Sequence, residues 1–222
     1  MTALRFPRGL YGITPEWDDT PRLLDAVALA AKNGMRALQL RRKTASADAI
    51  AQQAKALLPV CRAHDVVLII NDDWRLALSV GADGAHIGRD DGDIAQARAA
   101  LGPRALIGAS CYNDPSLGLS ALAAGVDYIA FGAVYPSSTK PQATHASLAL
   151  ITQMRAHVET LHMPRPAIVA IGGITPDNAA AVAQAGADSL ALIAGLFDAP
   201  DIAAAAAACA HLYSYTGSQH VT

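Results

Sequence analysis

The sequence is poor in cysteine, aromatic residues and charge, and these shortages exclude several classes of protein. Its three cysteines, Cys61, Cys111 and Cys209, are an odd number at wide spacings, with neither a Cys-x-x-Cys pair nor a disulfide pattern. Charged residues make up 16% of the chain and the net charge is −2, which argues against a nucleic-acid or anionic-membrane surface. A signal peptide and an apolar run of about 18 residues, the length that spans a membrane, are both lacking. We therefore expect a cytoplasmic protein whose partners are neither nucleic acid nor membrane, and this composition still leaves room for a local basic pocket that binds a phosphorylated small molecule.

The apolar residues that are present suffice for a sizeable core. They make up 52% of the 222 residues, and aromatic side chains only 5%. Residues 1–222 contain no domain boundary or low-complexity linker, so we expect one domain. The polar residues 216–222 predict a flexible C-terminal tail.

Short β-branched runs alternate with longer alanine-rich stretches along the chain. The expected strands are Gly9–Thr14, Ala37–Arg41, Val66–Asn71, Gly84–Ile87, Leu106–Ser110, Tyr128–Phe131, Ala167–Ile171 and Ser189–Ile193. The expected helices are Pro21–Lys32, Ser46–Ala63, Asp73–Val80, Gly92–Leu101, Pro115–Ala124, Leu148–Thr160, Pro176–Ala185 and Pro200–Leu212. Eight such units predict an α/β fold, the (β/α)8 TIM barrel.

A weak internal repeat supports this fold. A Gly-x-Asp turn occurs between a helix and the next strand at Gly81–Asp83, Gly125–Asp127 and Gly186–Asp188, with a looser copy at Asn33–Arg36. The glycine supplies the left-handed residue that ends the helix, and the short turn feeds a parallel strand. A doubly wound open sheet is the alternative, but Gly-x-Gly-x-x-Gly does not follow the first strand.

Polar side chains end the predicted strands, on the rim where a barrel carries its functional groups. In the second strand Gln39, Arg41 and Lys43 share one face, because alternate residues of a strand point the same way, whereas Arg42 points away. Two cations and an amide on one face can bind a phosphorylated anion. Solvated side chains at a charged rim are the alternative interpretation.

Carboxylates follow the third and fourth strands. Asp72 closes the third strand beside Asn71, and Asp91 follows the fourth. Carboxylates from adjacent loops can share a magnesium ion and leave its other positions for water and diphosphate oxygens. Helix capping is the alternative role: Asp72 competes with Asp73 for the next helix, and Asp91 precedes the helix that begins near Gly92.

Small and hydroxyl residues follow the later strands, where barrels commonly bind phosphate through hydroxyl groups and backbone N–H groups. They are Ser137, Thr139 and Lys140 in the loop Gly132–Lys140, and Gly173, Ala194 and Gly195 after the last two strands. A solvated loop and tight rim turns would use the same residue types. Two other residues give weak signals: His86 alone indicates an oriented structural imidazole, and Cys111 has no partner histidine to activate it.

At these positions the sequence resembles the thiamine-phosphate synthase family. The resemblance runs from Leu10 to Phe197 and depends on short motifs in order at strand ends. The motifs are Leu10–Thr14, Gln39-Leu40-Arg41-Arg42-Lys43, Asn71-Asp72, Gly84–Gly88, Gly108-Ala109-Ser110, Gly132–Lys140 and Ala170–Ile174. The resemblance implies a (β/α)8 transferase that joins hydroxymethylpyrimidine diphosphate to thiazole phosphate, or its carboxylate. Such an enzyme releases diphosphate and uses one Mg²⁺ ion per subunit.

Carried over residue by residue, the resemblance implies a role for each candidate. The pyrimidine diphosphate would be bound by Gln39, Arg41, Lys43, Asn71, Ser110 and Lys140, and the metal by Asp72 and Asp91. The thiazole phosphate would be bound by Ser137, Thr139, Gly173, Ala194 and Gly195. Arg41, Ser110 and Lys140 would be catalytic, because they neutralise a departing diphosphate in a dissociative reaction that needs no nucleophile or strong base.

The chain departs from the family's pattern at Arg89, Tyr112, Ser137 and Ala194. Arg89 adds a cation near the expected magnesium site, and Ala194 lacks the hydroxyl of a common serine. Two alternatives stay open: a thiazole tautomerase of the same fold, which uses a histidine where Tyr112 stands, and a non-catalytic binder of thiamine precursors. A homodimer is expected only because symmetric dimers are common.

Overall fold

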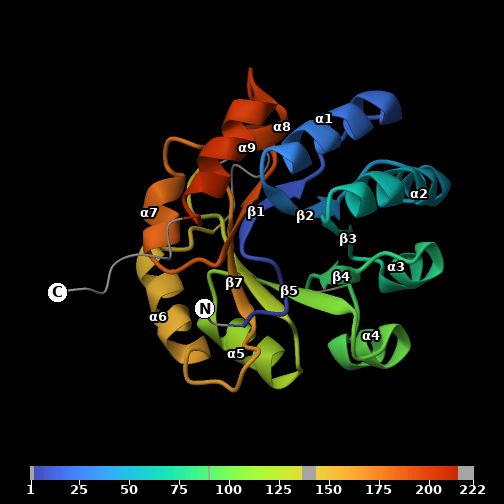
Figure 1. Ribbon diagram of the computed structural model, residues 1–222. Coiled ribbons are helices and arrows are strands. Elements are labelled where there is room, and N and C mark those ends of the chain that lie inside the picture. Colours follow the sequence, from blue (N-terminus) through green and yellow to red (C-terminus); the bar gives the residue numbers. More distant parts are fainter. Residues whose placement is uncertain (1–2, 90, 137–143, 215–222) are drawn as a thin grey trace.

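Eight parallel strands close into a barrel, with β1 to β8 in chain order and β8 hydrogen-bonded to β1 (Figure 1). The computed structural model describes residues 3–89, 91–136 and 144–214, so the expected tail at 216–222 lies outside the described part. The strands are β1 Gly9–Ile13, β2 Met35–Leu40, β3 Val67–Asn71, β4 Gly84–Ile87, β5 Leu106–Tyr112, β6 Tyr128–Phe131, β7 Ala167–Ile171 and β8 Ser189–Leu192. The closed barrel confirms the predicted (β/α)8 fold and excludes the open sheet.

Helices alternate with the strands and surround them (Figure 1). They are α1 Thr20–Lys32, α2 Ala47–Ala63, α3 Trp74–Val80, α4 Ile94–Leu101, α5 Pro115–Ala123, α6 Leu148–Val158, α7 Ala179–Gln184, α8 Ala194–Phe197 and α9 Ile202–His211. Among the described residues, none of these helices has the length and apolarity needed to cross a membrane.

Several element boundaries differ from the prediction by about two residues, and three differences have a clear physical reason. Strand β2 begins at Met35, two residues before the predicted start, because the turn at Gly34 leads directly into the sheet. Helix α7 begins at Ala179 rather than Pro176, because Asn178 accepts a hydrogen bond from the Thr175 N–H and closes a turn there. The short helix α8 was not predicted, since four residues are too few to show a helical period.

The repeated Gly-x-Asp turns hold the N-terminal ends of the strands together. Each aspartate precedes an even-numbered strand and accepts a backbone N–H from the second residue of the strand before it. The pairs are Leu68 N–H to Asp83 at 2.7 Å, Ile107 N–H to Asp127 at 2.8 Å and Ile168 N–H to Asp188 at 2.9 Å. The repeat is therefore a structural device, at the end of the barrel away from the predicted site.

The interior of the barrel is filled from that same end. Phe6 is fully buried and packs against Tyr128, with ring centroids 4.1 Å apart, and against Tyr11 at 5.0 Å. Ile69 and Val169 belong to the same interior cluster. Because aromatic rings close this end, the remaining space lies at the C-terminal ends of the strands.

Candidate functional site

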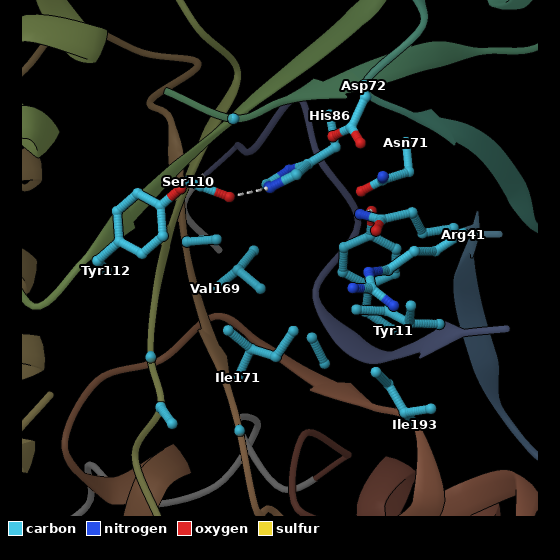
Figure 2. Close-up of a pocket in the computed structure, with 18 of the residues that line it drawn as sticks. Tyr11, Arg41, Asn71, Asp72, His86, Ser110, Tyr112, Val169, Ile171 and Ile193 are labelled. Atoms are coloured by element: carbon cyan, nitrogen blue, oxygen red, sulfur yellow. Dashed lines mark hydrogen bonds between the residues drawn. The ribbon is translucent and has the colours of Figure 1, made fainter. Parts of the chain in front are cut away.

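An open pocket of about 200 Å³ lies at the C-terminal ends of the strands. Figure 2 shows Arg41, Asn71, Asp72 and His86 on one wall, and Val169, Ile171 and Ile193 on the opposite wall. The expected residues that line this pocket are Gln39, Arg41, Lys43, Asn71, Asp72, Asp91 and Ser110. Seven candidates from four strand ends thus come together in space.

The end of β2 presents its charges to the pocket as the alternation predicts. Arg41 keeps 18% of its side chain exposed and lies beside Asn71 and Tyr11 in Figure 2. Thr14 fixes this segment, because its hydroxyl accepts the Arg41 N–H at 2.9 Å and donates to the Arg41 carbonyl at 3.2 Å. Lys43 also reaches the pocket, where its ammonium group pairs with Asp72.

Arg42 points away from the pocket, as predicted, and is buried under the loop that follows β1. Its guanidinium donates to the Trp17 carbonyl at 2.7 Å, to Gln53 at 2.8 Å and to Asp18 at 2.5 Å. Glu16 accepts from Arg42 at 3.3 Å and from the Lys43 N–H at 2.7 Å. This network fixes the backbone that carries Arg41 and Lys43.

Sequence reasoning missed the part played by Glu16. Partial burial alone would raise the pKa of its carboxyl, but hydrogen bonds from Lys43, Thr44 and Arg42 lower it overall. Glu16 Oε1 also lies 4.0 Å from the Arg41 guanidinium. The signal was absent because Glu16 and Arg41 are far apart in sequence and meet only when β1 pairs with β2.

Asp72 is free for the pocket because Asp73 caps the next helix. Asp73 accepts the Leu76 N–H at 2.9 Å, which decides the competition between the two aspartates. Asp72 has φ +65°, a left-handed conformation that aspartate tolerates better than most residues. Asp91 is not a helix cap either: it accepts the Gly88 N–H at 3.0 Å, and Asp93 caps α4.

The two carboxylates influence each other's ionisation. Burial alone would raise the pKa of Asp72, but the Lys43 ammonium group beside it lowers the pKa overall. Partial burial and the neighbouring Asp72 carboxylate raise the pKa of Asp91. Two adjacent carboxylates with one raised pKa are in electrostatic conflict, which a divalent cation would relieve. Asp72 and Asp91 therefore fit a magnesium ion, although no group of three or more potential metal ligands occurs among the described residues.

The far side of the mouth offers backbone groups and glycines instead of charges. A second hollow lies between the ends of β7 and β8, and its lining includes Gly173, Thr175, Ala194 and Gly195. Gly173 has φ +64°, and a Cβ there would lie 2.4 Å from the Pro136 carbonyl oxygen. Only glycine fits this close approach. The predicted residues Gly173, Ala194 and Gly195 lie together, because all three line this hollow.

The other expected residues have mixed outcomes. Ser137, Thr139 and Lys140 lie outside the described residues, so their predicted roles stay predictions. Arg89 lies 5.1 Å from the ring centroid of Tyr112 at the rim. Cys111 is buried, and burial raises the pKa of its thiol to about 12, which agrees with the prediction that it is no nucleophile.

His86 is the oriented imidazole that the sequence predicted. Its Nε2 lies 2.8 Å from Ser110 Oγ, the dashed line in Figure 2, and its Nδ1 lies 3.0 Å from the Tyr128 hydroxyl. Burial lowers the pKa of His86 to about 4, so the ring is neutral near pH 7. Sequence reasoning missed Tyr128 and Tyr11, because an inward tyrosine in a strand looks like any core residue.

Comparison with known proteins gives one consistent result. Residues 10–196 match the family model described as thiamine monophosphate synthase. The chain is 62% identical to the thiamine-phosphate synthase of Bordetella pertussis, over 96% of this chain and 99% of that protein. It is 51% identical to the protein of that name from Methylobacillus flagellatus, over 93% and 96%. The solved thiamine phosphate pyrophosphorylase from Pyrococcus furiosus aligns with a TM-score of 0.79 at 31% identity, over 94% of this chain and 96% of that one.

Proposed function

The chain belongs to the thiamine monophosphate synthase family, and we propose that its pocket joins a pyrimidine diphosphate to a thiazole phosphate, releasing diphosphate. It is a transferase of the thiamine-phosphate synthase type. The observation that carries the proposal is the convergence of Arg41, Lys43 and the Asp72–Asp91 pair on one wall of the pocket. That wall supplies charge for an anionic leaving group.

Each wall has its own part in the proposed reaction. Arg41, Lys43, Asn71 and Ser110 bind the diphosphate and neutralise its charge as the C–O bond to the pyrimidine methylene breaks. The hollow at Gly173 and Gly195 binds the phosphate of the thiazole, whose nitrogen then attacks the pyrimidine cation. The apolar wall at Val169 and Ile171 keeps water away from that cation.

Asp72 and Asp91 would hold the magnesium ion in this proposal. When bound, Mg²⁺ supplies positive charge to diphosphate oxygens and so makes diphosphate a better leaving group. The Lys43 ammonium, paired with Asp72 in this structure, is then free to contact the diphosphate. Ser137, Thr139 and Lys140 keep the roles that the family resemblance implies, with Lys140 on the departing diphosphate.

The proposal also includes the cellular compartment and the oligomeric state of the enzyme. Cys61, Cys111 and Cys209 are free and buried, as suits the reducing cytoplasm in which we place the protein. A homodimer stays a prediction from base rates, and the molar mass measured by light scattering would decide it.

The test is a direct synthesis. Purified protein is mixed with both substrates, with either Mg²⁺ or a chelator, and thiamine phosphate is followed as fluorescent thiochrome. We expect product only with both substrates and Mg²⁺. Absence of product, with both ligands still raising the melting temperature, would overturn the synthase and favour the tautomerase or the non-catalytic binder.

A further inference from the structure

A chain of hydrogen bonds crosses the barrel at the floor of the pocket. It runs from Gln39 on β2 through Tyr11 on β1 and Tyr128 on β6 to His86 on β4, and it ends at Ser110 on β5. The distances are 2.9 Å from Gln39 Nε2 to Tyr11 Oη, and 3.0 Å from Tyr11 Oη to Tyr128 Oη. Tyr128 Oη then lies 3.0 Å from His86 Nδ1, and His86 Nε2 lies 2.8 Å from Ser110 Oγ. Gln39, Tyr11, His86 and Ser110 line the pocket, and Tyr128 alone is not among its lining residues.

The two tyrosines in the middle of this chain are almost fully buried. Tyr11 and Tyr128 are 1% and 0% exposed, and His86, which lines the pocket, is 8% exposed. A buried hydroxyl without a partner is costly, and the exposed fractions of Tyr11 and Tyr128 leave almost no surface for water to replace a missing partner. Each of the two tyrosine hydroxyls must therefore find its acceptor within the chain.

The sequence makes room for this chain at Gly108. The register pairs His86 with Gly108 and Gly108 with Tyr128 on successive strands. A Cβ on Gly108 would lie 1.9 Å from Tyr128 Cζ, so only glycine lets the tyrosine ring lie across β5. The Tyr128 ring can then stack on His86, with centroids 5.5 Å apart and an interplanar angle of 24°.

Counting protons gives the chain one direction. Gln39 Nε2 can only donate, so the Tyr11 oxygen accepts and the Tyr11 proton goes to Tyr128. The Tyr128 proton then goes to His86 Nδ1, which leaves the imidazole proton on Nε2. Nε2–H donates to Ser110 Oγ, so the Ser110 proton points to another acceptor. In the opposite direction the Tyr11 proton would be buried without an acceptor in the chain.

We propose that His86 is a positioning residue, held as the Nε2–H tautomer by Tyr128, and that it turns the Ser110 hydroxyl proton toward an anion in the pocket. The same polarity leaves Gln39 Oε1 as the amide atom that can accept from a ligand. Gln39 thus presents an acceptor and Ser110 presents a donor. The inference extends the proposed function, since the anion that Ser110 contacts there is the diphosphate.

The first test reads the tautomer without any reaction. Long-range ¹H–¹⁵N correlation spectra of the full chain, labelled with ¹⁵N-histidine, distinguish protonated from unprotonated ring nitrogens, and His86→Gln assigns the resonance. We expect a protonated Nε2 and an unprotonated Nδ1. A protonated Nδ1 in the wild-type chain would overturn the proposed direction.

The second test removes the contact that holds the imidazole. Tyr128 lies below the pocket, behind Ala130, which lines the pocket, so an effect of Tyr128→Phe must pass through its neighbours. We expect kcat to fall about tenfold, the value for one misdirected hydrogen bond to a charged group, with a smaller change in KM. The His86 Nδ1 resonance should move toward that of an unbonded nitrogen.

Tyr213→Phe is the matched control. It also removes one hydroxyl from a largely buried ring, where Tyr213 donates to the Ala187 carbonyl at 3.0 Å, away from the pocket. We expect Tyr213→Phe to change the melting temperature about as much as Tyr128→Phe does and to leave kcat unchanged. Equal kcat values for the two variants would overturn the positioning role. A wild-type chain that makes no thiamine phosphate would instead overturn the proposed function, and the tautomer would still decide the direction.

Discussion

At the scale of single residues, Asp72 and Asp73 are neighbours with different environments. Asp72 faces Lys43 and Asp91 in the pocket, whereas Asp73 is exposed and caps α3. We expect Asp72→Asn to lower kcat by about two orders of magnitude, because the metal loses an anionic ligand. Asp73→Asn should stay within about twofold of the wild type, since asparagine is an equally good helix cap.

The thiochrome assay at saturating substrates measures both aspartate variants over a range of Mg²⁺ concentrations. We expect excess Mg²⁺ to restore part of the activity of Asp72→Asn, because the remaining ligands bind the metal more weakly. Wild-type rates in Asp72→Asn at low Mg²⁺ would contradict the metal assignment.

Gly173 offers a second test at this scale. A methyl group there would meet the Pro136 carbonyl oxygen, which narrows the hollow proposed for the thiazole phosphate. We expect Gly173→Ala to raise the KM for the thiazole substrate tenfold or more, about 1.4 kcal/mol of lost binding. The KM for the pyrimidine diphosphate should change much less, because its wall is untouched.

Gly125→Ala controls for backbone strain. Gly125 has φ +82° and nothing within 4 Å of its added Cβ, and it lies at the opposite end of the barrel. In both variants a left-handed alanine costs about 1–2 kcal/mol of stability, and Gly173→Ala loses more because its Cβ also meets the Pro136 carbonyl oxygen. Steady-state kinetics with each substrate varied should separate them, and equal KM values for the thiazole would refute the proposed phosphate hollow.

At the scale of elements, the Gly-x-Asp turns share one sequence pattern but contribute differently to stability, because their aspartates have different neighbours. Asp188 is buried and accepts two hydrogen bonds from Arg165, both at 2.8 Å, and one from Arg155 at 2.5 Å. Asp83 makes the same backbone contact to the preceding strand but no ion pair among the described residues. The difference is not visible in the sequence of the turns, because the arginines that pair with Asp188 come from other segments.

We expect Asp188→Asn to lower the free energy of unfolding by about 3–5 kcal/mol, because it leaves a buried arginine without its counterion. Asp83→Asn should cost about 1 kcal/mol, the loss of one weakened hydrogen bond. Urea unfolding followed by circular dichroism measures both. Equal losses would show that the backbone contact, and not the ion pairs, holds this end of the barrel.

Features with a local sequence signal could be predicted, whereas features that depend on contacts between distant segments could not. Alternating strand and helix patterns gave the eight strands and the polar ends of β2 and β3, since those signals are local. The sequence could not show which of Asp72 and Asp73 caps α3, because both precede the helix. The two aspartates differ in backbone conformation, which is left-handed at Asp72. The chain from Gln39 to Ser110 was invisible because it joins five strands whose register must be known first.

At the scale of the whole molecule, barrel closure brings the two parts of the site together. Strands β7 and β8 carry the glycine hollow, and closure of β8 on β1 brings it beside β2, whose end carries Arg41. Ile171, Gly172, Ala191 and Ile193 line both hollows, so the two are continuous. One end of the barrel therefore forms a single continuous site with the two regions that we propose bind anions.

The most direct test of this account is a crystal structure of the protein with thiamine phosphate, diphosphate and Mg²⁺. We expect diphosphate beside Arg41 and Ser110, the metal between Asp72 and Asp91, and the phosphate of thiamine phosphate against Gly173 and Gly195. The thiazolium ring should lie between them, near Ile171. Diphosphate in the glycine hollow, or a metal bound away from both aspartates, would contradict it.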